Sequence, residues 1–275
     1  MTTCIAAICH KERKIVTASD FLLTIPGKIQ FQAALPKLTM ISPSGRWFSL
    51  FSNKDSEAEA IWMDVRDRLA HQPDEKWLTV TNAFKDACRH RIDERAEAET
   101  FWDTKCLNAI EKEGKHTGWI KRLRRDIGQK QSRVELDVRF ILAGFDSNDE
   151  PRLFLVEHPG KIEPITPRGF GAIGTGGELA SVSLGLVFPR KQVHRIVELE
   201  ELVYRVCCAK FDSESAPDVD TATFVTVHNI AGNWECLSDE TITNVRRAWE
   251  DSKMTPAAME DIIKGGFVKP VCGGL

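Results

Sequence analysis

The chain has 275 residues, which at about 150 residues per domain leaves room for one large domain or two small ones. Its 42% hydrophobic and 28% charged residues are typical of a folded globular protein and exclude the disordered and fibrous classes. The net charge of −3 argues against nucleic acid as a partner, and no apolar run approaches the roughly 20 residues of a membrane span.

The cysteines and the first residues bear on metal binding and location. The eight cysteines include no C-x2-C pair and no histidine at zinc-finger spacing, so we expect them to be small buried side chains. The apolar segment 2–9 has no basic leader and is not expected to be a signal peptide. We therefore predict a cytoplasmic protein with no metal site and no cofactor.

The chain is predicted to open with strands only. Five extended segments are expected, at residues 2–9, 14–19, 27–30, 37–41 and 47–51. The charged turn 11–13 makes a hairpin of the first two segments, and the turn 42–45 makes one of the last two.

Helical spacing follows from Asp55, where apolar residues recur every three or four positions, and a second helix is expected after Asp74. Charge dominates residues 89–135. The basic run 121–125 is typical of a solvated helical face, with a docking patch as the alternative.

The second half repeats the alternation of strands and helices. The expected strands are 134–143, 152–156, 222–230 and 234–236, and the expected helices are 177–186, 191–210 and one from Asp239. An acidic loop at 212–220 and a glycine-rich tail complete the chain. Blocks of strands alternating with blocks of helices favour an α+β sandwich, with helix layers covering the sheets.

The second residue carries a chemical possibility of its own. Initiator Met is normally removed before a small residue, which would leave Thr2 as the mature N-terminus. An N-terminal Thr holds a hydroxyl nucleophile beside an α-amine, whose ordinary pKa of about 7.7–8.0 suits a general base.

Four ordered motifs resemble those of proteasome β subunits and the bacterial HslV peptidase. Thr2-Thr3 opens a hydrophobic strand, and the second strand ends in Ala18-Ser19-Asp20. Lys37 opens a strand seventeen residues after Asp20, and the run 172–180 matches the family's Ile-Gly-Ser-Gly-Gly before a helix, with Thr175 in place of Ser. The resemblance covers residues 2–70 and 134–232.

The resemblance implies a four-layer α-β-β-α sandwich of the N-terminal nucleophile (Ntn) hydrolase type. Residues 1–275 would form one such domain, with 71–133 an enlarged charged helical region and 237–275 a C-terminal extension.

It also implies roles for individual side chains. Thr2 would attack the scissile carbonyl, Lys37 would lower the pKa of the Thr2 hydroxyl and amine, and Asp20 would hold Lys37. Thr175 would offer its hydroxyl to the amine or to the bound water. Backbone N–H groups at the end of the strand 48–51 would bind the oxyanion.

Two parts of the pattern depart from the family. Where the family has a glycine at the oxyanion position, this chain has Phe51, Ser52 and Asn53, whose side chains would narrow the substrate cleft. Asp218 and Thr221 stand for the family's Asp and Ser before the last central strand, but the loop here is longer.

These residues predict a threonine-type endopeptidase that acts on peptides or unfolded proteins inside a homo-oligomeric ring, with an unfoldase among its conceivable partners. Two alternatives stay open. One is an Ntn amidohydrolase that acts on small amides. The other is a catalytically silent subunit that uses the fold only to build a ring.

Overall fold

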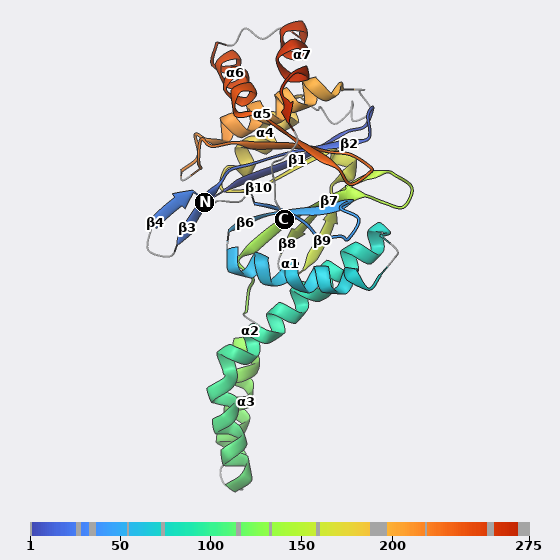
Figure 1. Cartoon of the computed structure of the whole chain (residues 1–275). Helices are drawn as coiled ribbons and strands as arrows, with labels where there is room; N and C mark the ends of the chain where they lie inside the picture. Colours follow the sequence, from blue (N-terminus) through green and yellow to red (C-terminus); the bar gives the residue numbers. More distant parts are fainter. Residues whose placement is uncertain are drawn as a thin grey trace.

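The computed structural model of the chain describes residues 2–25, 29–32, 37–53, 55–72, 75–113, 117–131, 134–157, 160–187, 197–217, 219–251 and 256–268. Two antiparallel sheets are stacked face to face, and each carries helices on its outer face (Figure 1). The layer order is therefore helices, sheet, sheet, helices. This confirms the predicted α-β-β-α sandwich.

The first sheet holds the N-terminal hairpin at its centre. Its strand order is β10-β1-β2-β11-β12-β13, and every neighbouring pair is antiparallel. The strands are β1 (Thr3–Cys9), β2 (Lys14–Ser19), β10 (Phe170–Gly174), β11 (Phe224–His228), β12 (Trp234–Leu237) and β13 (Phe267–Val268). All seven residues of β1 are buried because the strand is covered on both faces, which explains its near-continuous apolar sequence.

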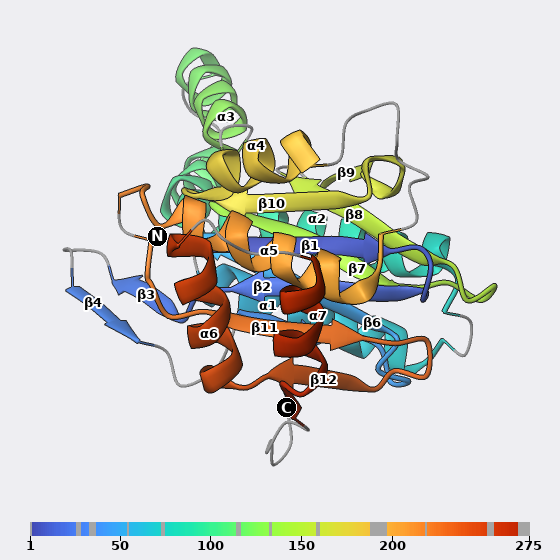
Figure 2. The same cartoon turned by 90° about the horizontal axis from the view of Figure 1, so that it is seen from above.

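The second sheet has the order β5-β6-β7-β8-β9 and is also antiparallel. Its strands are β5 (Leu38–Met40), β6 (Trp47–Asn53), β7 (Val138–Phe145), β8 (Pro151–Glu157) and β9 (Lys161–Pro164). A separate hairpin of β3 (Leu22–Ile25) and β4 (Ile29–Gln32) follows β2 and projects from the side of the sandwich where the N-terminus lies (Figures 1 and 2).

The helices divide between the two outer faces. Figure 2 shows α4 (Gly177–Val187), α5 (Leu199–Ser213), α6 (Asp239–Glu250) and α7 (Pro256–Lys264) lying over the first sheet. The second sheet is covered by α1 (Asp55–Ala70) and the first part of α2 (Trp77–Glu113). The rest of α2 pairs with α3 (Thr117–Gln131) and extends well beyond the sandwich (Figure 1). Within the described residues, none of the helices combines the length and apolarity needed to cross a lipid bilayer.

Alternation along β1 and β6 separates the cores. Even-numbered side chains such as Cys4 and Leu50 pack between the sheets, whereas odd-numbered ones such as Ile5 and Phe51 face the helix layers. Near the ends of these strands, side chains of even-numbered residues therefore face the space between the sheets, and those of odd-numbered residues face the helix layers.

Several boundaries differ from those predicted. β7 begins four residues later than expected, β11 is shorter, and α5 runs from Leu199 to Ser213; residues 188–196 lie outside the described part. β3, β9, β10, α7 and β13 were not predicted. The strands among them are too short to show a clear period-2 pattern, and α7 has only nine residues.

Candidate active site

Thr2, Asp20 and Lys37 meet at one end of the space between the two sheets. The Thr2 hydroxyl donates to Oδ1 of Asp20 at 3.2 Å, and the Lys37 Nζ forms an ion pair with the same oxygen at 3.1 Å. The exposed fractions of the three residues are 2%, 0% and 4%. The carboxylate thus links a hydroxyl and an ammonium group in a setting largely closed to water.

Backbone contacts hold Asp20 and Lys37 in place. Oδ2 of Asp20 accepts the N–H of Thr3 at 2.9 Å, and the Asp20 N–H donates to the Thr3 carbonyl at 3.3 Å. Lys37 lies just before β5, and its carbonyl accepts the Phe51 N–H at 3.3 Å. The hairpin β1–β2 therefore positions the acid, and the pairing of β5 with β6 positions the lysine.

Cys4 connects the two sheets beside this group. Its thiol donates to the Phe51 carbonyl at 3.1 Å. Burial raises the pKa of the Cys4 thiol far above its usual range, although Lys37 acts in the opposite direction. A neutral thiol is a poor nucleophile, so Cys4 ties β1 to β6 and does not compete with Thr2. Only its even position in β1 could have indicated this contact from the sequence.

The glycine-rich turn between β10 and α4 packs against the start of β1. Gly174 has a φ of +92°, and a Cβ at this position would overlap the Thr2 carbonyl oxygen. A Cβ on Gly176 would meet the Thr3 hydroxyl and Ser213 of α5. Thr175 lies between these glycines and is exposed. The structure thus brings the backbone around Thr175 to Thr2.

Gly174→Ala is expected to disrupt the site more than Gly169→Ala. Both glycines have left-handed φ angles, but a Cβ on Gly169 has nothing within 4 Å. Gly169→Ala should therefore cost only the left-handed penalty, about 1–2 kcal/mol of unfolding free energy. Gly174→Ala should cost more because Thr2 must also move. Urea unfolding of both variants compares the two costs; equal losses would contradict the close packing of Gly174 on Thr2.

The end of β6 completes this side of the site. Ser52 is fully buried, and its hydroxyl has no hydrogen-bond partner in the described part of the chain. By the alternation of β6, it points between the sheets, as Phe48 and Leu50 do. Phe51 points to the helix side, and both of its backbone polar groups are hydrogen-bonded.

Asn53 takes the backbone conformation that a glycine would take. Its φ is +76°, in the left-handed region where Asn is among the best-tolerated side chains after Gly. Its Nδ2 also donates to Oδ1 of Asp137, which precedes β7, at 3.2 Å. The sequence lacks the glycine expected here, but the backbone turn that a glycine would allow is present.

Asn53→Gly should preserve stability and any activity, because Gly adopts a positive φ without strain. Asn53→Val should lose about 1–2 kcal/mol of unfolding free energy or more, since a β-branched residue is disfavoured there. Asp137→Ala serves as the control, removing the side-chain bond while leaving Asn53 in place. Thermal unfolding compares the three. If Asn53→Val matches wild type, the positive φ is not required.

A buried ion network holds the loop that leads into β11. Lys210, fully buried on α5, donates to Glu214 at 2.9 Å and to the Asp220 carbonyl at 2.7 Å. Arg246 binds both oxygens of Glu214 and also donates to the Thr221 carbonyl at 2.8 Å. These residues gave no signal in the sequence beyond their charge.

Thr221 itself is exposed, and it lines a cavity of about 490 Å³ together with Phe21, which follows Asp20. Phe224 pairs with Ser19, so the loop before β11 lies at the same end of these two strands as Asp20. Asp218 lies outside the described residues.

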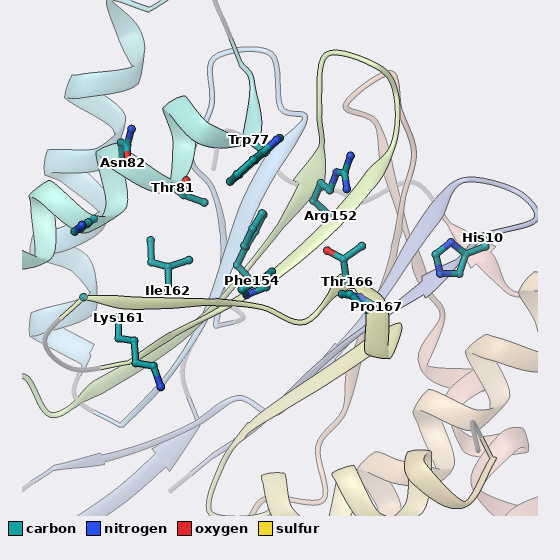
Figure 3. Close-up of a pocket in the computed structure, with 13 residues that line it drawn as sticks. His10, Trp77, Thr81, Asn82, Arg152, Phe154, Lys161, Ile162, Thr166 and Pro167 are labelled. Atoms are coloured by element: carbon teal, nitrogen blue, oxygen red, sulfur yellow. The ribbon is translucent and has the colours of Figure 1, made fainter. Parts of the chain in front are cut away.

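A larger cavity, of about 1160 Å³, lies far from Thr2. Its lining includes His10, which lies beyond the opposite end of β1, eight residues and about 26 Å along the strand from Thr2 at about 3.3 Å per residue. Trp77 and Phe154 stack in it with ring centres 5.9 Å apart. In Figure 3, Lys161 extends to the opposite side of its strand from Ile162. Arg152 is paired with Asp146 at 2.8 Å. Its charged groups do not converge, so we do not place the active site there.

Comparisons with known proteins identify the fold. No family model matches the chain, and no curated protein matches it. Among solved structures, Anbu from Yersinia bercovieri, described as an ancestral beta-subunit, aligns with a TM-score of 0.63 and 11% identity, covering 91% of this chain and 94% of its own.

Anbu from Hyphomicrobium sp. strain MC1 aligns similarly. A mutant gives a TM-score of 0.62 and a second structure 0.60, each at 16% identity and covering 93% of this chain and 98% of the other. At such low identity the likeness concerns the fold alone, and on that evidence the chain has the proteasome-like Ntn-hydrolase fold.

Proposed function

We propose that the chain is a threonine-type endopeptidase whose nucleophile is Thr2 after removal of Met1. The observation that carries the proposal is that the Thr2 hydroxyl and the Lys37 ammonium group share one oxygen of Asp20, at 3.2 and 3.1 Å. If Asp20 were only a turn residue and Lys37 only a solvated charge, neither side chain would need to be buried. Removal of Met1 would supply the free α-amine that acts as the general base.

The proposed reaction is acyl transfer to Thr2. The amine takes the proton of the Thr2 hydroxyl while Oγ attacks the carbonyl carbon of the scissile amide, and the leaving amine then takes that proton. Water hydrolyses the resulting ester and regenerates Thr2. Lys37 stabilises the developing negative charge on Oγ, Asp20 keeps Lys37 in position, and Thr175 binds the amine or the attacking water.

We assign the oxyanion donor to the N–H of Asn53. The Phe51 N–H and carbonyl point toward Lys37 and Cys4, so the backbone groups of Ser52 point the other way, toward β7. The Asn53 N–H lies opposite the Ser52 carbonyl across one planar peptide and therefore points back toward the Lys37 side. Ser52, which points between the sheets, shapes the cleft next to it, whereas the side chain of Phe51 packs on the helix side and leaves only its backbone beside the cleft.

The proposal extends to the loop before β11, to the assembly and to its partners. Thr221 would take the part of the family's Ser and Asp218 that of its Asp, as the resemblance implies, and Arg246 holds the Thr221 carbonyl in the loop before β11. The fold supports a homo-oligomeric ring with Thr2 facing its interior, peptides or unfolded proteins as substrates, and an unfoldase as a partner that could supply them.

A small-amide amidohydrolase is the second candidate. It is favoured by the tight enclosure of the site, where Ser52 and Asp20 are both fully buried. A catalytically silent ring subunit is the third, and the shared Asp20 oxygen argues against it.

The three functions differ in what the processed protein cleaves. We would incubate it with an unfolded protein, with short peptides and with small N-acyl amides, and identify products by mass spectrometry. Internal peptide cleavage supports the endopeptidase. If only small amides are hydrolysed, the protein is the amidohydrolase. If nothing is cleaved although Met1 is lost and the protein assembles, it is the silent subunit.

A further inference from the structure

The paired helices α2 and α3 form an arm that extends beyond the sandwich. α2 has 37 residues, a length of about 55 Å, and only its first part lies on the second sheet (Figure 1). Beyond that part it packs against α3, with Leu107 and Ile127 buried. None of the residues placed at the candidate active site comes from the arm.

The two helices of the arm carry opposite charge. α3 contains five basic residues and one acidic residue, whereas the stretch of α2 from Asp86 to Glu113 contains eight acidic and five basic residues. Some of these charges are neutralised within the chain: Lys130 pairs with Asp103 at 2.5 Å, and Arg91 pairs with Glu57 and Glu94, each at 2.9 Å.

Two clusters stay without an ion pair among the described residues. We call Lys121, Arg122 and Arg125 the basic patch, and Asp93 and Glu97 the acidic patch; all five side chains are exposed. Asp93 and Glu97 are four residues apart, as are Lys121 and Arg125, so each pair lies on one helix face.

The patches cannot neutralise each other within one arm. Glu97 lies 16 residues, or about 24 Å, before the end of α2, while Lys121 and Arg125 lie about 6–12 Å from the start of α3 at the same tip. Their separation along the arm, on the order of 12–18 Å, exceeds the screening length of about 8 Å at physiological ionic strength.

We propose that the arm is a head-to-tail contact between copies of this chain, in which the basic patch of one copy binds the acidic patch of the next. The complementary charges are both on this chain, and its net charge of −3 disfavours a polyanion as the occupant. Because the two patches differ, the contact is heterologous and builds a ring or an open helix. This deepens the proposed assembly and does not depend on catalysis.

Charge exchange between the patches tests the contact. One variant carries Arg122→Glu and Arg125→Glu, and a second carries Asp93→Lys and Glu97→Lys. Sedimentation velocity should show that each variant alone associates roughly tenfold or more weakly than wild type, because like charges now meet. Mixing the two, or combining all four substitutions in one chain, should restore assembly. Raising NaCl from about 0.1 M to about 1 M should weaken the wild-type association.

A matched control carries Lys161→Glu and Arg168→Glu, which change the same charge on exposed residues of the sandwich, and should assemble as wild type does. The proposal is overturned if wild type is monomeric at low salt, if either patch variant assembles normally, or if mixing fails to restore assembly. It is also overturned if the basic patch binds single-stranded DNA while assembly ignores both patches. All measurements use Thr2→Ala protein as well, so a failed contact and a failed peptidase are told apart.

Discussion

Thr2→Ala is expected to abolish amide cleavage while leaving the melting temperature nearly unchanged. The substitution removes the proposed nucleophile but only one hydrogen bond, that to Asp20 at 3.2 Å. A bond of this kind contributes about 0.5–1.5 kcal/mol to stability, and some loss at the start of the chain is tolerated. Thr2→Ser should keep part of the activity, because it keeps a hydroxyl beside the amine.

Thr3 provides a matched control for this prediction. It is as deeply buried as Thr2, but its hydroxyl has no hydrogen bond among the described residues. Thr3→Val should therefore keep both stability and peptide cleavage, whereas Thr2→Val should lose cleavage alone. Progress curves with a fluorogenic peptide measure both variants. Cleavage at the wild-type rate by Thr2→Ala or Thr2→Val would exclude Thr2 as the nucleophile.

Lys37→Met is expected to abolish activity and to lower the free energy of unfolding more than Thr2→Ala does. It leaves the carboxylate of Asp20, which is fully buried, without its cation. Breaking a buried ion pair by removing one partner typically costs about 3–5 kcal/mol. Asp20→Asn should also be inactive, because a neutral amide no longer pairs with the Lys37 ammonium group and so no longer holds it in position.

The double variant Asp20→Asn with Lys37→Met separates folding from chemistry. Removing both charges avoids leaving either one unpaired, so most of the stability lost in Lys37→Met should return. Activity should not return, because the Lys37 ammonium group is then missing beside Thr2. Chemical unfolding of the four proteins gives the coupling free energy. Additive losses in the double variant would mean that the pair does not act as a unit.

The ordered motifs predicted more of the candidate site than the hydrophobic patterns of the strands and helices did. Asp20 and Lys37 belong to the ordered motifs that resemble the proteasome family, whereas Lys210 and Arg246 belong to no motif. The ion pair of Lys37 with Asp20 agrees with the role expected for them, although the catalytic assignments stay predictions. The network of Lys210, Glu214 and Arg246 depends on how α5 and α6 pack, which no local pattern encodes.

Two other features could not be predicted from the sequence because they depend on tertiary contacts. The positive φ of Asn53 comes from tertiary constraints at the end of β6, since Asn alone favours but does not dictate that conformation. The contact of Cys4 with Phe51 depends on the stacking of the two sheets. By contrast, the length of α2 was partly readable, because residues 77–113 contain neither glycine nor proline.

The most direct test of the account is the intact mass of the protein before and after exposure to a peptide epoxyketone. This probe reacts with both the hydroxyl and the free amine of an N-terminal Thr, forming a ring that neither group forms alone. The account predicts loss of Met1 and a single adduct that is absent in Thr2→Ala. A retained Met1, or an equal adduct in Thr2→Ala, would contradict it.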